Sequence, residues 1–322
     1  MNQKPAVCRD IEADLVAAAT GEAESAAVRR VQDHVGLCRP CASEFGRYRA
    51  IDRVVGGLRS EPLPAPQVTR ARAELESRLA DLRSRLVTYC VFPSPLGRIL
   101  IGCSEQGVSL VEYLGSGTGL KASRLSRVAG VEPMADGAEI EVLYRELLEY
   151  LDGRRTRLEW PLDLRLAQSE FHRAVLETTA AIPYGAVTSY AGIAREIGKP
   201  AAVRAVAQAL RWNPLPIVVP CHRVIGSYGS LTGYAGNKIT LKQRLLAVEG
   251  VGTVRAHHDL RVARDAMYVT EHGERAYCLP TCGSLASRTL AQLTLFASRE
   301  RAEAVGLRPC TSCRPDLHPI SH

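Results

Sequence analysis

Six of the ten cysteines in this 322-residue chain lie in closely spaced pairs near its two ends. The N-terminal segment carries Glu12 and Asp14 where a signal peptide needs an unbroken apolar stretch, so we expect a cytoplasmic protein. Close cysteine pairs in such a protein are typical of zinc ligands rather than disulfides. The sequence therefore predicts a zinc site near each end, from the pairs Cys38 and Cys41, Cys278 and Cys282, and Cys310 and Cys313.

The length of the chain predicts several domains, at about 100–200 residues for each. Apolar residues spaced by three and four before Cys38 predict a helical first domain, and the run Pro62-Leu63-Pro64-Ala65-Pro66 predicts a semi-rigid linker. Residues 71–86 are rich in Arg, Glu and Leu and predict an amphipathic helix. No apolar stretch approaches the roughly 20 residues of a membrane span, so we expect no membrane association.

The middle of the chain changes from strand to helix patterns. Strands are predicted at 87–92, 98–102 and 107–111, and a helix at 140–151. Helices follow at 171–182, 189–197 and 201–211, and the Gly198 turn between the last two suggests a helix-turn-helix. The expected fold class is multidomain α+β, with units at 1–58, 59–86 (linker and helix), 87–165, 166–252, 253–268 (linker) and 269–318.

Positive charge is concentrated in residues 187–250, which carry eight Lys or Arg against two Glu, a net charge of +6. A surface of this kind attracts a polyanion such as DNA, because each neutralised phosphate releases counterions. A basic face kept for solubility is the alternative.

Cys221 stands apart from the paired cysteines, at the end of the apolar run Ile217-Val218-Val219 and directly before His222. The run predicts a strand that buries the cysteine. A buried thiol is ordinarily inert, whereas a nucleophilic one needs a base, a cation or a helix N-terminus close by. A bare Cys-His pair leaves both a packed core cysteine and a nucleophile open.

The wider pattern resembles the O6-alkylguanine-DNA alkyltransferase family over about residues 87–250. The resemblance rests on separated segments of the chain: Ser94-Pro95-Leu96-Gly97, Pro183-Tyr184-Gly185, Thr188-Ser189-Tyr190, Ala202-Val203-Arg204-Ala205-Val206, Asn213-Pro214, Pro220-Cys221-His222-Arg223-Val224, Gly233-Tyr234-Ala235-Gly236 and Glu249-Gly250. It implies a ribonuclease H-like sheet-and-helix subdomain, followed by a helix-turn-helix subdomain that acts as a monomer on double-stranded DNA.

The resemblance also implies residue roles. Cys221 matches the cysteine that irreversibly accepts an alkyl group from O6 of guanine, and probably from O4 of thymine, without a cofactor. His222 and Glu249 match the pair that takes the thiol proton through a bridging water. Tyr190 matches the proton donor to the departing base, and Asn213 the amide that braces the turn before the site.

The same resemblance implies DNA contacts. Arg204 matches the arginine that fills the gap left by an extruded nucleotide, which offsets part of the cost of unstacking. The segment Gly233-Tyr234-Ala235 matches the loop that closes over the flipped base. Ala205, a small neighbour on the same helix, and Arg223 complete the predicted DNA-binding set.

The N-terminal cysteine pair has further ligands nearby. Cys8, His34, Cys38 and Cys41 together could form a tetrahedral zinc site. The segment resembles the zinc-binding domain of anti-sigma factors over about residues 5–58. Either a purely structural zinc or a module that responds to oxidation or binds a partner, such as a sigma factor, fits this pattern.

The C-terminal pairs resemble the metal-binding domain of the Ada-type methylation-response proteins. In that family four thiolates bind zinc, here matched by Cys278, Cys282, Cys310 and Cys313, and the first also accepts a methyl group from DNA phosphotriesters. Leu279 departs from the arginine common after the first cysteine. Cys278 is therefore either a second methyl acceptor or a structural ligand alone.

Two functions remain open at this stage. The first is a single-turnover alkyltransferase that repairs DNA. The second is a non-catalytic protein that binds damaged DNA and signals through its zinc modules. The presence of Cys221, His222, Asn213 and Glu249 together favours the first, because a protein that only binds needs no nucleophile. A cysteine hydrolase would also need an oxyanion site, for which the sequence gives no support.

Overall fold

The computed structural model describes residues 6–60, 65–115, 123–128, 131–135, 138–236, 238–256 and 259–320. The chain divides into two units, Met1–Leu79 and Ala80–His322. The predicted α+β multidomain class is confirmed, while the finer domain boundaries drawn from the sequence remain predictions. Among the described helices, none is both long and apolar enough to cross a membrane.

The first unit is helical. It contains α1 (Ala6–Asp10), α2 (Glu12–Thr20), α3 (Ser25–Leu37) and α4 (Arg39–Ser60), together with most of the long helix α5 (Ala65–Arg85), which continues into the second unit. Its small core includes Leu15 and Val31, which are almost fully buried, and two of its cysteines. Residues 61–64 of the predicted proline-rich linker lie outside the described residues.

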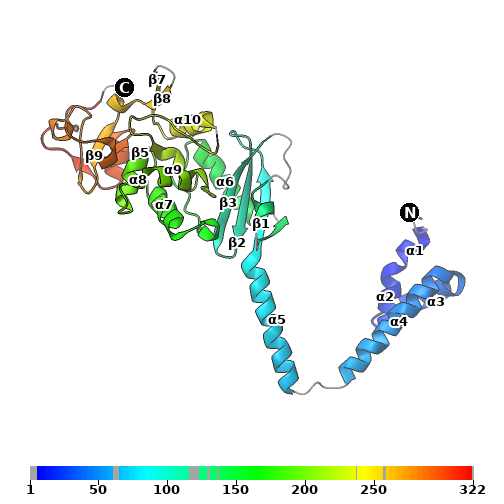
Figure 1. Ribbon diagram of the computed structural model, residues 1–322. Helices are drawn as coiled ribbons and strands as arrows, with labels where there is room; N and C mark the ends of the chain where they lie inside the picture. Colours follow the sequence, from blue (N-terminus) through cyan, green and yellow to red (C-terminus); the bar gives the residue numbers. More distant parts are fainter. Residues whose placement is uncertain are drawn as a thin grey trace. The chain divides into compact units, whose positions relative to one another are not determined.

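The second unit begins with a four-stranded sheet in the order β3-β2-β1-β4. Its strands are β1 (Leu86–Phe92), β2 (Arg98–Ser104), β3 (Gly107–Leu114) and β4 (Glu132–Ala135), and helix α6 (Ile140–Leu151) packs against β1 and β2 (Figure 1). The three predicted strands and the predicted helix are thus confirmed. Short 3₁₀ turns lie at η2 (Leu125–Arg127) and η3 (Leu164–Leu166).

Three helices and a turn form the helix-turn-helix region. Helix α7 (Glu170–Ala180) leads to strand β5 (Ala186–Ser189), and then α8 (Tyr190–Glu196) and α9 (Val203–Arg211) pack together. The Ser189 hydroxyl caps α8 by accepting from the Gly192 amide at 3.0 Å. Gly198 takes φ +72° in the turn between the two helices, a conformation that glycine adopts without strain. The helix-turn-helix prediction is confirmed.

The predicted strand at Ile217–Val219 is wrong. The segment is a tight turn in which the Val219 amide donates to the Leu215 carbonyl at 2.8 Å, and Ile217 has φ 78°. The apolar side chains are buried as expected, but prolines on both sides of the run prevent a regular ladder of hydrogen bonds. The turn leads into the 3₁₀ segment η4 (Cys221–Arg223), strand β6 (Val224–Ile225) and helix α10 (Ile239–Val248).

The C-terminal part is built onto this region instead of following a linker. The segment predicted as a linker at 253–268 contains a hairpin of β7 (Thr253–Ala256) and β8 (Asp259–Val262). Strand β11 (Leu293–Phe296) then inserts between β5 and β9 (Tyr268–Glu271), which gives a sheet in the order β6-β5-β11-β9. The remaining elements are η5 (Arg264–Ala266), β10 (Ala276–Tyr277), η6 (Gly283–Leu285), η7 (Leu290–Gln292), α11 (Arg299–Ala304) and β12 (Arg308–Pro309).

Candidate active site and zinc clusters

Asn213 fixes the position of the Cys221 sulfur. Its side-chain amide donates to the Val219 carbonyl at 2.9 Å and lies 3.2 Å from Cys221 Sγ, while its Oδ1 accepts from the Leu215 amide at 2.9 Å. One side chain therefore braces the whole turn before the cysteine. This arrangement agrees with the predicted role of Asn213, and Cys221 itself is only 6% exposed.

Glu249 lies at the centre of a fully buried polar network. It contacts His222 Nε2 through Oε1 at 2.6 Å and accepts from Arg223 Nε through Oε2 at 2.9 Å. The Gly185 amide donates to Oε2 at 2.9 Å, and the Tyr150 hydroxyl donates to Oε1. The structure thus brings the predicted pair of His222 and Glu249 together, next to Cys221.

This network determines the protonation states at the site. Burial acts to raise the pKa of Glu249, but the charges of His222 and Arg223 outweigh it and lower the pKa to about 2. Burial lowers the pKa of His222 despite the nearby carboxylate. At neutral pH Glu249 is therefore ionised and the imidazole neutral. With Nε2 bonded to Glu249, the buried Nδ1, which has no hydrogen-bond partner among the described residues, remains as a proton acceptor.

Two cations that the sequence analysis gave no role face the thiol. Burial raises the pKa of Cys221, while the Asn213 amide and the charges of Lys242 and Arg124 lower it. Lys242 is fully buried, and its Nζ donates to the carbonyls of Val224 at 2.6 Å and Thr232 at 3.0 Å. Burial lowers the pKa of Lys242 to about 8. Its place on the apolar stripe of α10, three and four residues before two buried leucines, is the sequence signal that could have identified it.

Cys221 lines a cleft of about 480 Å³ between α9 and the loop at 232–236. Arg204 is exposed on α9 and lines the cleft, and Ala205 is exposed beside it. Tyr190 also lines the cleft, and its hydroxyl donates to the Thr232 carbonyl at 3.3 Å. Burial raises the pKa of Tyr190 to about 12, so it keeps its proton at neutral pH.

The loop at 233–235, which lines the cleft, is bonded to the sheet subdomain. Gly233, Tyr234 and Ala235 all line the cleft, and both Gly233 and Ala235 have positive φ. The hydroxyl groups of Tyr234 and Tyr113 lie 2.8 Å apart and are buried. Tyr113, on strand β3, is thus a further residue that the sequence analysis missed.

The structure places Arg223, which the sequence analysis assigned to the DNA-binding set, inside the Glu249 network. Its side chain is 8% exposed and is paired with Glu249, and it also donates to the Ile182 carbonyl and the Tyr150 hydroxyl. A buried guanidinium held in this way points into the protein, and it does not line the cleft that contains Cys221. The sequence could not distinguish the two cases, because Arg223 follows His222 directly and the turn of η4 decides which way each side chain points.

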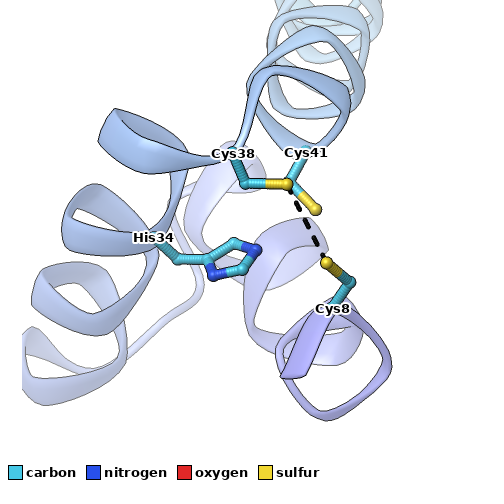
Figure 2. A group of neighbouring side chains, drawn as sticks. All are labelled: Cys8, His34, Cys38 and Cys41. Atoms are coloured by element: carbon cyan, nitrogen blue, oxygen red, sulfur yellow. Dashed lines mark hydrogen bonds between the residues drawn. The ribbon is translucent and has the colours of Figure 1, made fainter. Parts of the chain in front are cut away.

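The four N-terminal ligands converge. Cys8, His34, Cys38 and Cys41 come from α1, α3 and the start of α4, and their ligand atoms lie within 4.8 Å of one another (Figure 2). The Nε2 atom of His34 is buried without a hydrogen-bond partner among the described residues, which is costly unless a metal binds there. This donor set fits tetrahedral zinc.

The four C-terminal cysteines also form one cluster. The sulfurs of Cys278, Cys282, Cys310 and Cys313 lie within 4.8 Å of one another. Cys278 and Cys282 are buried, and the other pair is partly exposed. Four thiolates in this arrangement fit a closed zinc site, so zinc at both predicted sites is supported by the geometry.

Comparisons with known proteins agree with this geometry. A family model described as the DNA-binding domain of 6-O-methylguanine DNA methyltransferase matches residues 170–251, and one described as the metal-binding domain of Ada matches residues 256–316. The methylated-DNA–protein-cysteine methyltransferase of Methanosarcina acetivorans is 37% identical over 164 residues, which cover 50% of this chain and 97% of that protein. The chain belongs to this methyltransferase family.

Two further relatives show how far the likeness extends. The bifunctional transcriptional activator and DNA repair enzyme Ada of Escherichia coli is 37% identical over 167 residues, which cover 51% of this chain and 45% of that protein. The crystal structure of the Mycobacterium tuberculosis O6-methylguanine methyltransferase is 36% identical and has a TM-score of 0.43, covering 51% of this chain and 92% of that one.

The Glu249→Gln variant tests the buried network. We expect alkyl transfer to slow by about 10²-fold, because the amide no longer orients His222 as a base. The stability of the wild type should fall as the pH drops from about 4.3 toward 2, since Glu249 must then be protonated, and the variant should lack this component. Single-turnover rates and acid unfolding measure both effects.

The matched control is Glu177→Gln, at an exposed position on α7. It removes the same charge without touching the network, so the rate and the acid response should be unchanged. Equal rates for Glu249→Gln and the wild type would show that the buried carboxylate has no part in activating the thiol.

Proposed function

We propose that this protein repairs DNA by transferring an alkyl group irreversibly from O6 of guanine to Cys221 Sγ. The observation that carries the proposal is the position of Cys221, which lies in the cleft beside a neutral histidine and faces two cations. His222 accepts the thiol proton, Sγ forms a bond to the alkyl carbon, and the bond from that carbon to O6 breaks. Tyr190 gives a proton to the departing base. No cofactor enters this step, and the thioether formed is stable, so each molecule acts once.

The cleft also suits an extruded base. Its volume of about 480 Å³ lies in the range of small-molecule sites, and Arg204 lines it from the exposed side of α9. A cation at this position can occupy the gap that the flipped nucleotide leaves in the duplex. We therefore propose that Arg204 and Ala205 contact alkylated double-stranded DNA, that the loop 233–235 closes over the base, and that O4-alkylthymine is a second substrate.

Peptide mass mapping tests the proposal. After incubation with a duplex that carries O6-methylguanine, one added methyl group is expected on the peptide that contains Cys221. A Cys90→Ser variant is the control and should accept the same amount, because Cys90 lies on strand β1 outside the cleft. Full binding of the duplex by an unmodified protein would instead indicate a protein that senses damage without repairing it.

The C-terminal cluster carries a second proposal, that Cys278 accepts a methyl group from a DNA phosphotriester. Its sulfur would bond to the methyl carbon while the carbon–oxygen bond breaks and leaves a phosphodiester. Zinc bound by the four cysteines would keep their sulfurs deprotonated. The match of this segment to the metal-binding domain of Ada supports the proposal. The same mapping, with a methylphosphotriester duplex, should find methyl on Cys278, and its absence would leave the cluster a structural role alone.

For the N-terminal cluster we propose a structural zinc that holds α1, α3 and α4 together, in a module that binds a protein partner. If the module also senses oxidants, mild oxidation should release zinc and reduce helicity together, because the ligands come from all three helices. Circular dichroism and a zinc-binding dye follow the two signals. Retention of both under oxidant would exclude the sensor role.

A further inference from the structure

The C-terminal zinc-binding segment, by which we mean the chain from β7 to β12, shares a sheet with the region around Cys221. Strand β11 pairs with β5 along one edge and with β9 along its other edge, and β5 also pairs with β6. Strand β6 begins directly after the 3₁₀ turn that contains Cys221. The hydrogen-bond ladder of one region is therefore completed by the other.

A single row of residues crosses this sheet from a zinc ligand toward the reactive cysteine. The backbone of Cys278 exchanges two hydrogen bonds with Val269, at 2.9 and 2.7 Å. Val269 is opposite Leu295, and Leu295 is opposite Val187. Next to Val187, Thr188 is opposite Val224 on β6. Every step is a backbone pairing except the one along β5 from Val187 to Thr188, so a displacement of Cys278 can be passed along the row.

The side chains along this row form one core. Val187, Ile225, Val269 and Leu295 are at most 4% exposed and belong to the same apolar cluster. Separating the C-terminal segment would expose these apolar side chains to water on both sides, which is unfavourable because their burial stabilises the fold. The segment thus shares one core with the Cys221 region and belongs to the same compact unit.

A second set of contacts reaches Glu249. The Ala297 amide donates to the Gly185 carbonyl at 2.8 Å, and the Gly185 amide donates to Glu249 Oε2 at 2.9 Å. The guanidinium of Arg301 lies 4.5 Å from the ring centre of Tyr184. Gly185 has φ +73°, and a Cβ there would lie 3.1 Å from both the Glu249 carbonyl and Arg301 Cγ. The C-terminal segment therefore packs closely against Gly185, whose amide donates a hydrogen bond to the Glu249 carboxylate.

The hairpin β7–β8 supports the loop on the other side of the cleft. The Leu231 amide donates to the Leu260 carbonyl at 2.8 Å, and the Val262 amide donates to the Gly229 carbonyl at 2.9 Å. The loop residues that line the cleft begin directly afterwards, at Thr232. The C-terminal segment thus contacts both the catalytic network and the base of the closing loop.

From these contacts we infer that the C-terminal zinc segment is a structural part of the Cys221 centre, and that Arg301 is a positioning residue for Glu249. The inference rests on the proposed alkyl transfer at Cys221. The two cysteine sites are accordingly coupled: when the C-terminal cluster loses its metal, Gly185 and strand β5 loosen, and transfer at Cys221 slows.

The full chain with Cys310→Ser and Cys313→Ser tests the coupling. These substitutions remove the two more exposed ligands and keep Cys278. We expect faster amide hydrogen exchange at Val187 and Thr188, and a rate of methyl transfer about ten-fold lower. The matched control empties the other cluster with Cys38→Ser and Cys41→Ser, in the first unit, and should change neither measurement.

Arg301 provides a milder variant that retains the metal. Arg301→Ala should slow transfer about three-fold and move the acid limb of the pH profile of the rate to lower pH, because a His222 that is held less well against the Glu249 carboxylate has a lower pKa and is a weaker base. Arg301→Lys keeps a cation over the Tyr184 ring and should restore both. The number of methyl groups accepted per molecule should stay the same in both variants. A lower number would indicate that part of the protein is unfolded, whereas a misoriented His222 slows the transfer without reducing this number.

The outcomes separate this inference from the proposed function. If the wild type accepts no methyl group, the proposed function fails, and the exchange rates still report whether the segment is docked. If the wild type is active and loss of the C-terminal ligands leaves the transfer rate unchanged, the coupling is refuted. Unchanged exchange at Val187 and Thr188 would refute the docking itself.

Discussion

The Cys221→Ser variant is expected to bind an O6-methylguanine duplex and to accept no methyl group from it. The serine oxygen is smaller than sulfur and can still accept the hydrogen bond from the Asn213 amide, so the turn should keep its shape. An alcohol is a far weaker acid than a thiol, and the neutral His222 cannot generate an alkoxide from it. The duplex should therefore remain bound and unrepaired.

Cys103 provides the control for this variant. Burial, together with the charge of Glu139, raises its pKa to about 11. Cys221 is also buried, but it faces Lys242 and Arg124 instead of a carboxylate. Cys103→Ser should therefore leave methyl acceptance unchanged. Intact-protein mass and gel retention of the duplex measure transfer and binding separately, and transfer by the Cys221→Ser protein would show that another residue is the acceptor.

Much of the Cys221 site could be predicted from the sequence because separated segments of the chain resemble those of a known family. The resemblance named Cys221, its neighbour His222, Asn213 and the distant Glu249, and the structure brings the three separate segments that carry them together. The sheet and helix-turn-helix patterns were equally visible, since their apolar periods are regular. Both zinc clusters followed from ligand spacing alone.

Other features depend on tertiary contacts that no local pattern carries. Ile217–Val219 has the composition of a strand, but the surrounding prolines fold it into a turn. Residues 253–268 have the sequence pattern of a linker. In the structure β8 forms backbone hydrogen bonds with Gly229 and Leu231, which are distant in the sequence. The place of Lys242 on the apolar stripe of α10 indicates that it is buried, but its partners, the carbonyls of Val224 and Thr232, lie on other segments and only the structure identifies them.

The contacts of Arg223 also could not be predicted from the sequence, and its substitution is expected to cause a large loss of stability. Arg223→Leu should destabilise the protein by about 3–5 kcal/mol, because it leaves Glu249 buried with only His222 and neutral donors as partners. Denaturant unfolding of the variant measures this loss. A DNA contact at the same position would instead leave stability unchanged and weaken binding.

Arg204→Leu is the matched control and should give the opposite result. Arg204 is exposed on α9, so its loss should change the free energy of unfolding by about 0.5 kcal/mol or less. It should weaken binding of the damaged duplex by about 1–3 kcal/mol. Normal stability of Arg223→Leu, together with a weaker salt dependence of its DNA binding, would restore Arg223 as a phosphate contact. A large loss of stability with an unchanged salt dependence in the folded fraction would place the role of Arg223 entirely within the Glu249 network, because only exposed cations release counterions from DNA.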